Sequence, residues 1–387
     1  MPIELLVLQA TAFCNLDCRY CYVPERSNRA RMSGSTLHRV GELLASSALL
    51  GSRAGLEVLW HAGEPLAAGL DFYRQAGSIL SGHLPNCTLE PSFQTNATLI
   101  TEDWCDYFAE SHAKVGISID GPEDIHDSQR MRRHGKGSFQ ETMRGAQLLR
   151  SNGMALSALC VLTPASLREP KRMFDFFDST EFSSVAFNVE EAEGEHLISL
   201  MNDHAPSIRS GYSAFMKAFL EENERRNWPL TVREFQLISE RLRRRARDAS
   251  YYPVEPENEL GRVLTISRDG EIFSWSPELA SGYRGDALAF SLGNVHSTES
   301  LDELLTNRIA VSIQSEIDRG VAECRKTCEY FSVCGGGLPS NKIYENGSFD
   351  STATSRCRLQ IKMLTDILLD HCTYSANDAE YVINPSH

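Results

Sequence analysis

Three cysteines in one short segment carry the most specific chemistry in this sequence. Cys14, Cys18 and Cys21 follow the spacing C-x-x-x-C-x-x-C, directly after the apolar run 5–8. Thiolates hold iron–sulfur clusters with one Cys per iron, so three cysteines on a four-iron cluster leave one iron open. A closed structural zinc site needs four ligands instead. The spacing therefore predicts a catalytic cluster with a free coordination position.

Four more cysteines lie near the C-terminus, separated by gaps of three, five and twenty-two residues: Cys324, Cys328, Cys334 and Cys357. Four thiolates complete a site for either a zinc ion or an iron–sulfur cluster. The other cysteines are scattered over separate elements, where a small buried thiol is ordinary, so we expect them to hold no metal. They are Cys87, Cys105, Cys160 and Cys372.

Composition narrows the class of protein. The formal net charge of −14 argues against a nucleic-acid binder, which would carry a basic surface, and the basic run 241–247 is typical of a solvated helix face. A chain of 387 residues with 42% hydrophobic content predicts one large domain and a smaller one. We find no membrane-spanning run and no signal peptide, so we expect a cytoplasmic enzyme whose cysteines are thiols and metal ligands.

Apolar runs alternate with amphipathic stretches in a βα rhythm. We expect strands at 5–11, 57–62, 89–95, 114–120, 155–162 and 182–189, and helices at 35–50, 70–82, 101–112, 138–152 and 167–179. This alternation predicts a parallel sheet with right-handed crossovers. In barrels of parallel strands the working residues gather at the C-terminal strand ends, which is where the first cysteine segment lies.

Polar residues follow several of these strands. Gly63 and Glu64 end the second strand, Asn96 the third and Asn188 the sixth. On the fourth strand Ser118 and Asp120 are two residues apart and point to one face. Ordinary turns and caps use the same residue types, so these patterns leave both a structural and a functional interpretation open.

The segment with Tyr20 before the third cysteine resembles the radical S-adenosylmethionine (radical SAM) enzymes. The resemblance implies an open, partial (β/α)6 barrel and a [4Fe-4S] cluster on Cys14, Cys18 and Cys21. SAM would fill the open iron through its amino and carboxylate groups and be cleaved reductively to a 5'-deoxyadenosyl radical.

The family's Gly-Gly-Glu-Pro motif is matched here by Ala62-Gly63-Glu64-Pro65, in which Glu64 would receive the SAM ammonium group. Ala62 replaces the first glycine, and because alanine adds only a methyl group, the backbone can still approach a ligand here if the φ of Ala62 is negative. Arg130 is our candidate for the SAM carboxylate, which a guanidinium matches with two hydrogen bonds. The full set of predicted SAM-binding residues is Tyr20, Gly63, Glu64, Asn96, Ser118, Asp120, Arg130 and Asn188.

The C-terminal cysteines, followed by Gly335-Gly336-Gly337, resemble the SPASM extension of peptide-modifying radical SAM enzymes. That resemblance implies an auxiliary [4Fe-4S] cluster on all four. A second auxiliary cluster in the family usually takes a Cys from a hairpin before Gly-Asn, but the hairpin 265–279, with Asp269-Gly270 at its turn, has none. We therefore predict two clusters in total and the domains 1–198 (radical SAM barrel), 199–258 (helical bridge) and 259–387 (SPASM-like).

Over nearly its whole length the chain looks like the maturases that form cyclophanes in ribosomally made peptides. These enzymes join an aromatic ring carbon to the β-carbon of a residue two positions later. Restoring the ring requires loss of one proton and one electron, so a carboxylate and the fully ligated cluster are the expected acceptors. Candidate bases are Asp120, Glu234 and Glu278.

Two other functions are weighed against this one. An anaerobic sulfatase maturase, which forms formylglycine, shares the motifs but usually has two auxiliary clusters. A cluster-storing electron carrier or zinc scaffold would need no open iron. We expect a precursor peptide as substrate and a flavodoxin or ferredoxin as reductant. No leader-binding winged-helix domain precedes the first strand, so we expect the precursor to dock on this chain or on another protein.

Overall fold

A mixed ten-stranded sheet organises the computed structural model, which describes residues 2–51 and 54–375. The strand order is β10-β9-β8-β1-β2-β3-β4-β5-β6-β7. From β1 to β7 each strand pairs in parallel with the next along the chain, as the βα rhythm predicts. The sheet is thus larger than the six strands that the sequence predicted.

The strands are β1 (Leu5–Leu8), β2 (Gly55–Trp60), β3 (Thr88–Thr95), β4 (Lys114–Ser118), β5 (Ser157–Leu162), β6 (Ser184–Val189), β7 (Thr231–Val232), β8 (Val263–Ile266), β9 (Glu271–Ser274) and β10 (Gly293–Asn294). The α-helices are α1 (Gly34–Ser46), α2 (Leu70–His83), α3 (Glu102–Glu110), α4 (Glu123–Gln129), α5 (Phe139–Ser151), α6 (Pro170–Ser179), α7 (Pro206–Arg225), α8 (Arg233–Arg247), α9 (Leu301–Leu304), α10 (Arg308–Thr327), α11 (Phe331–Cys334), α12 (Pro339–Asn346) and α13 (Leu364–Ser375). Short helical turns are η1 (Pro65–Ala68), η2 (Ser166–Arg168), η3 (Pro256–Asn258), η4 (Pro277–Ser281) and the π-helix η5 (Cys357–Met363).

The two faces of the sheet differ in burial. In β2, β5 and β6 fully buried residues alternate with half-buried ones at every second position. Successive side chains of a strand point to opposite faces, so one face packs into the core and the other lines a more open interior. Ser118 and Asn188 belong to the half-buried set, which places them on the open side.

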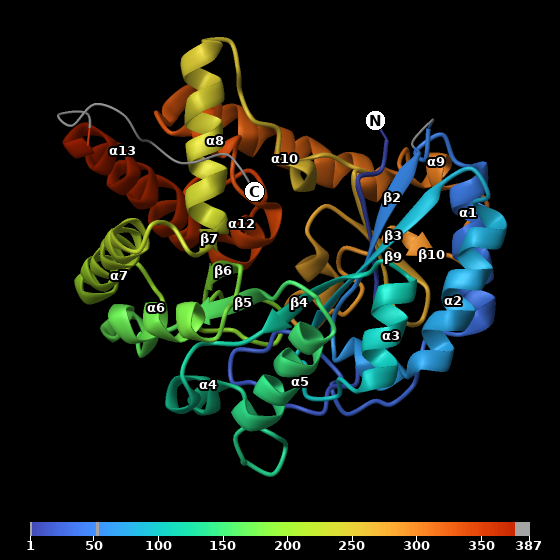
Figure 1. Cartoon of the computed structure of the whole chain (residues 1–387). Coiled ribbons are helices and arrows are strands. Elements are labelled where there is room, and N and C mark those ends of the chain that lie inside the picture. Colours follow the sequence, from blue (N-terminus) through green and yellow to red (C-terminus); the bar gives the residue numbers. More distant parts are fainter. Residues whose placement is uncertain (1, 52–53, 376–387) are drawn as a thin grey trace.

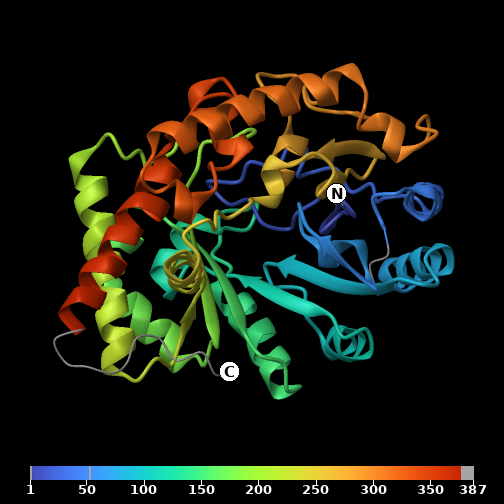
Figure 2. The ribbon, with the colours of Figure 1, turned by 90° about the horizontal axis from the view of Figure 1, so that it is seen from above.

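The C-terminal third of the chain is built onto the same sheet. β8 pairs in parallel with β1, and β9 returns antiparallel to β8 through the Asp269-Gly270 turn, where Gly270 has a φ of 89°. Figure 2 shows α10, in orange, along the side of the sheet that the N-terminal helices leave open, and α13, in red, beside α7. The domain division at 198 and 258 stays a prediction, and the sheet runs across it.

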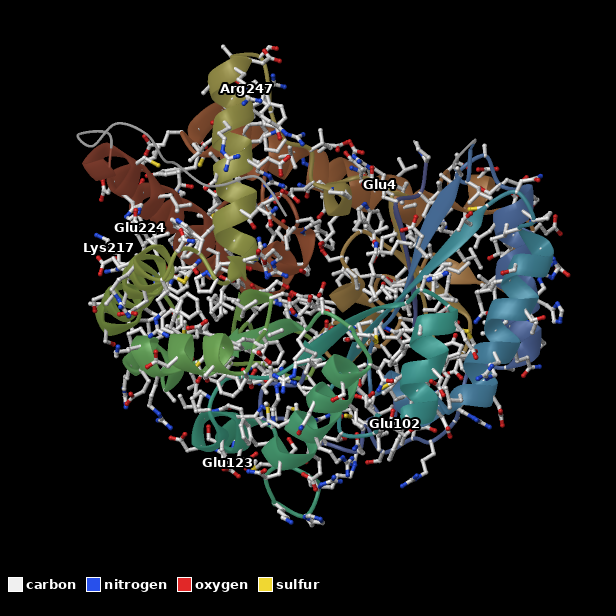
Figure 3. The ribbon with its side chains drawn as sticks, in the orientation of Figure 1. Glu4, Glu102, Glu123, Lys217, Glu224 and Arg247 are labelled. Carbon is white, nitrogen blue, oxygen red and sulfur yellow. The ribbon has the colours of Figure 1, made fainter. Side chains whose placement is uncertain are left out.

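Each predicted strand and helix matches an observed element, although the ends differ by a few residues. The sequence reasoning did not predict α4, which is short and mostly polar. The basic run 241–247 lies on α8 (Figure 1), and Arg247 extends from the end of this helix that is remote from the sheet (Figure 3). Within the described residues, every helix is too short or too polar to cross a bilayer.

Candidate active site

The first three cysteines lie on a loop directly after β1. Backbone contacts define its course: the Cys14 amide donates to the Arg26 carbonyl at 3.0 Å, and the Cys21 amide to the Cys18 carbonyl at 3.2 Å. The guanidinium of Arg133 donates to the Cys14 carbonyl at 3.0 Å. All three thiols are half-buried. The loop therefore presents the three side chains at one end of the parallel sheet.

The three thiols are close enough to affect one another. Burial raises the pKa of Cys18 to about 12, although the nearby Arg130 opposes this shift. Burial also raises the pKa of Cys14, with added repulsion from Glu64, Cys18 and Cys21. Thiolates gathered in this way need positive charge, which iron supplies, so the donor set fits the cluster that the sequence predicts.

The segment after β2 packs tightly under the cysteine loop. A Cβ on Gly63 would lie 2.6 Å from the Thr11 carbonyl oxygen and 2.7 Å from that of Phe13. Only glycine permits this approach. The φ of Ala62 is 72° and that of Gly63 is 61°, so the condition of a negative φ at Ala62 is not met.

Glu64 is buried beside the cysteine loop and is held by three donors. Its Oε1 accepts from Thr95 Oγ1 at 2.6 Å and the Leu66 amide at 3.1 Å, and its Oε2 from the Asn96 amide at 2.8 Å. Burial raises the pKa of Glu64 to about 7 despite these bonds. A carboxylate has about four acceptor sites, so one remains for a ligand ammonium group.

Asn96 joins the third strand to the cysteine loop. Its Nδ2 donates to Asn15 Oδ1 at 2.9 Å and lies 3.8 Å from Cys14 Sγ. Asn15 in turn donates to Thr98 Oγ1 at 2.7 Å. The sequence reasoning missed Asn15 and Thr98, whose only signal was their position next to predicted site residues.

Asp120 lies at the centre of a buried network after β4. Its Oδ1 accepts from the Val161 amide at 3.0 Å, and its Oδ2 accepts from the Tyr20 hydroxyl and lies 3.0 Å from Arg130 Nε. Asp120 is 1% exposed and Arg130 7%. Three donors thus engage the Asp120 carboxylate, as three engage that of Glu64, and by the same count one acceptor site remains.

Two other predicted residues bind their neighbours. The Ser118 hydroxyl accepts from Gln94 Nε2 at 2.8 Å, and Asn188 Oδ1 accepts from Arg233 at 2.6 Å. Gln94 and Arg233 line a cavity of about 330 Å³ on the open side of the sheet. Ser118 and Asn188 therefore each contact a side chain that lines this cavity.

The candidate bases differ in their surroundings. Glu234 is buried and accepts from the Phe187 amide at 3.0 Å and from Arg233, so it joins α8 to β6. The Glu234 carboxylate is therefore not free, as a proton acceptor would need to be. Glu278 lies in η4, where burial raises its pKa to about 7, with Glu191 adding repulsion. Among the three candidates, the geometry favours Glu278 as the proton acceptor.

The four C-terminal cysteines come together from α10, α11 and η5. Cys328 is the C-cap of α10, and its amide donates to the Cys324 carbonyl at 2.9 Å. Burial is the main cause of the raised pKa of Cys357, and Cys334 and Cys328 contribute repulsion. Within the described residues, no three such ligands surround a single metal-ion position.

Lys342 tests whether an anionic cluster fits this site. It is 1% exposed, and its Nζ has no hydrogen-bond partner. Burial lowers the pKa of Lys342, whereas Cys324, Cys334 and Cys357 oppose that shift. A buried ammonium group beside three of the four thiols supplies counter-charge for a thiolate-ligated cluster, so the residues fit.

Comparison with known proteins agrees with this architecture. Residues 8–177 match the model of the radical SAM superfamily. A serine-type anaerobic sulfatase-maturating enzyme of Bacteroides thetaiotaomicron is 32% identical over 366 residues, covering 88% of this chain and 84% of the relative. An uncharacterised protein of Synechocystis sp. is 35% identical, covering 95% and 92%.

Solved structures share the fold. The structure of native anSMEcpe with bound AdoMet has a TM-score of 0.77 at 22% identity and covers 98% of this chain and 100% of that one. Streptococcus suis SuiB bound to its precursor peptide SuiA has a TM-score of 0.62 at 14% identity, covering 92% and 76%. The chain belongs to the radical SAM superfamily and is a radical SAM enzyme of the maturase type, related over most of its length to anaerobic sulfatase-maturating enzymes.

Proposed function

We propose that this maturase joins an aromatic ring of a precursor peptide to the β-carbon of a residue two positions later. The observation that supports this proposal is the arrangement of cysteines. A three-cysteine loop faces the open end of the sheet, a four-cysteine site lies beside the buried Lys342, and the β8–β9 hairpin adds no further thiol. This set suits one reactive cluster and one electron acceptor.

SAM and the two clusters, when bound, supply hydrogen-atom abstraction and one-electron transfer. The proposed SAM ligands remain Tyr20, Gly63, Glu64, Asn96, Ser118, Asp120, Arg130 and Asn188. Among them Glu64 has the clearest role, because its carboxylate is buried beside Cys14 and can accept from an ammonium group.

Closing the cross-link removes two hydrogens from the peptide. One leaves the β-carbon as a hydrogen atom. The other leaves the ring carbon as a proton, which the Glu278 carboxylate accepts. Cys324, Cys328, Cys334 and Cys357 would hold a cluster that could take up the remaining electron. The chain itself thus provides the proton acceptor and the thiolates.

Formylglycine formation is the second candidate, and the named relatives favour it. The Bacteroides thetaiotaomicron relative is called a serine-type sulfatase-maturating enzyme. That reaction would also use a β-hydrogen abstraction and a two-electron oxidation. Such enzymes usually hold two auxiliary clusters. This chain differs from them because its hairpin 265–279 has no cysteine.

Co-expression with the peptide encoded beside the enzyme separates the two reactions. A cross-link should give a product lighter by two hydrogens, with fragmentation suppressed between the aromatic residue and the residue two positions on. Deuterium at the β-carbon of that second residue should appear in deoxyadenosine. A product that reacts with an aldehyde probe, or deuterium transfer only from a Ser or Cys β-carbon, would reject the cross-link in favour of formylglycine.

The proposed function includes a reductant and a location in the cell. A flavodoxin or ferredoxin is the proposed reductant, and the cytoplasm the proposed location. The precursor peptide would bind along the open side of the sheet, where the cysteine loop and the C-terminal segment meet.

A further inference from the structure

Four glutamates from three separate segments converge behind the cysteine loop. Glu191 and Glu193 follow β6, Glu257 lies in η3 and Glu278 in η4. Each carboxylate is repelled by at least one of the others. Asn341 touches two of them: it hydrogen-bonds to Glu191, and its Nδ2 lies 3.4 Å from Glu193 Oε1. We call these four side chains the carboxylate cluster.

The carboxylate cluster lies between the two cysteine sites. On one side, the Glu195 amide donates to the Tyr22 carbonyl at 3.1 Å, and Tyr22 directly follows Cys21. On the other side, Arg356 Nε lies 3.8 Å from Glu191 Oε1, and Arg356 directly precedes Cys357. A group bound to the carboxylate cluster would thus lie between both proposed redox sites.

Positive charge is scarce at this position. Arg356 acts on Glu191, Glu257 and Glu278, so one guanidinium serves three carboxylates. Burial and mutual repulsion raise the pKa of Glu191 to about 7 and that of Glu257 to about 8, and raise that of Glu193 strongly. The carboxylate cluster therefore holds protons near neutral pH that a bound cation would displace.

The unpaired atoms at the carboxylate cluster are acceptors. Asn341 is 2% exposed, and its Oδ1 has no hydrogen-bond partner; the same holds for Glu257 Oε2. A buried acceptor without a donor is unfavourable. Ammonium and guanidinium groups offer three to five donors and no acceptor, so they complement this site in both charge and hydrogen bonding.

The carboxylate cluster reaches the surface at Glu191. The side chain of Glu191 is 19% exposed and that of Arg356 is 25% exposed. Of the four carboxylates, Glu191 lines a cavity of about 280 Å³, together with Tyr344.

We propose that the carboxylate cluster binds the ammonium or guanidinium group of a Lys or Arg in the peptide substrate. This contact would fix the peptide's register between the two cysteine sites. This inference rests on one part of the proposed function, namely that the substrate is a peptide. It applies equally to the cross-link and to the formylglycine reaction.

Proton release follows from this binding. A cation stabilises the charged carboxylates, so binding at pH 7 releases protons and becomes tighter as the pH rises from 6 to 8. The other titratable or charged groups that face the carboxylate cluster are Tyr22, Tyr344, Glu255, Glu345 and Arg356. Glu255 already pairs with Arg241 at 2.5 Å, and Glu345 accepts from the Ser355 amide at 2.7 Å.

The test measures binding without turnover. Anaerobic calorimetry of the cluster-loaded enzyme with SAM and no reductant would compare two peptides, acetyl-Gly-Gly-Trp-Gly-Arg-Gly-Gly-amide and the same peptide with citrulline for Arg. We expect the Arg peptide to bind at least about tenfold more tightly at pH 7.5. Two buffers with different ionisation enthalpies should show proton release for the Arg peptide alone.

Variants assign the effect to the carboxylate cluster. Glu193→Gln should remove most of the preference for Arg, whereas Glu221→Gln, which changes an exposed residue of α7, should keep it. Iron content and circular dichroism would show that Glu193→Gln is folded, and Glu278→Gln provides a second variant. Equal binding of both peptides, binding of neither, or no proton release would overturn the proposal. The proposed function would fail separately, on the chemistry of the product.

Discussion

Arg130 Nε lies 3.0 Å from Asp120 Oδ2, in an ion pair that is almost completely buried. Tyr20, from the cysteine loop, donates to the same Asp120 oxygen, and the Arg130 guanidinium lies 5.3 Å from the centre of the Tyr20 ring. The pair therefore attaches the cysteine loop to the end of β4. This ion pair, together with Tyr20, holds the loop that carries the three half-buried thiols in one conformation.

Asp120→Ala should destabilise the protein by about 3–5 kcal/mol, because it leaves the Arg130 charge buried without its partner. Urea unfolding of the metal-free protein would measure this loss. The control is Asp124→Ala, which breaks an exposed pair with Arg172 and should cost about 0–1 kcal/mol. Equal losses in the two variants would show that Asp120 does not hold the loop.

The combined replacement of Cys14, Cys18 and Cys21 by Ala should lower the iron content from about eight to about four per chain. No deoxyadenosine should form when SAM and a reductant are added. Iron analysis and chromatography check the two results. Replacing the buried Cys160 by Ser should keep the iron, and SAM cleavage by the triple variant would contradict the assignment.

Gly63→Ala should disrupt the cysteine loop, because the new methyl group would lie within 3 Å of the Thr11 and Phe13 carbonyl oxygens. We expect loss of the cluster that the loop holds, seen as about half the iron and no SAM cleavage. Gly135→Ala is the matched control: Gly135 also has a positive φ, of 81°, but nothing lies within 4 Å of the added carbon. Similar iron loss in both variants would point to backbone strain instead of the close approach.

Lys342→Met should make the auxiliary site harder to reduce, since it removes a buried positive charge beside Cys324, Cys334 and Cys357. We expect its potential to fall by about 60 mV or more, a tenfold change for a one-electron couple. A redox titration followed by electron paramagnetic resonance gives this value. Lys326→Met, at an exposed site on α10, should leave the potential unchanged.

Glu278 predicts a pH dependence of the oxidation. Because burial raises its pKa to about 7, the carboxylate is protonated below that pH and cannot accept a proton. With a substrate that places no Lys or Arg at the carboxylate cluster, product formation should therefore rise as the pH increases through about 7 and then level off. Glu278→Gln should lower the rate by about 10²- to 10⁴-fold and abolish the rise of the rate with pH, whereas Glu221→Gln should keep this rise. An unchanged rise of the rate with pH in Glu278→Gln would exclude Glu278 as the base.

The sequence alone predicted the candidate cluster ligands and the order of the elements. Cys14, Cys18 and Cys21 are local in sequence, and the alternation of apolar residues defines strands such as β5 without knowledge of the partners. The Asp269-Gly270 turn likewise predicted its hairpin, because a turn depends on adjacent residues.

Contacts between distant residues were decided only by the tertiary structure. The sequence could not show that Asp120 is engaged by Tyr20 and Arg130, or that Glu234 joins α8 to β6, since each contact joins separate segments. Nor could it bring Glu191, Glu257 and Glu278 together. Burial and neighbouring charge change the chemistry of a carboxylate, and both depend on how the chain packs.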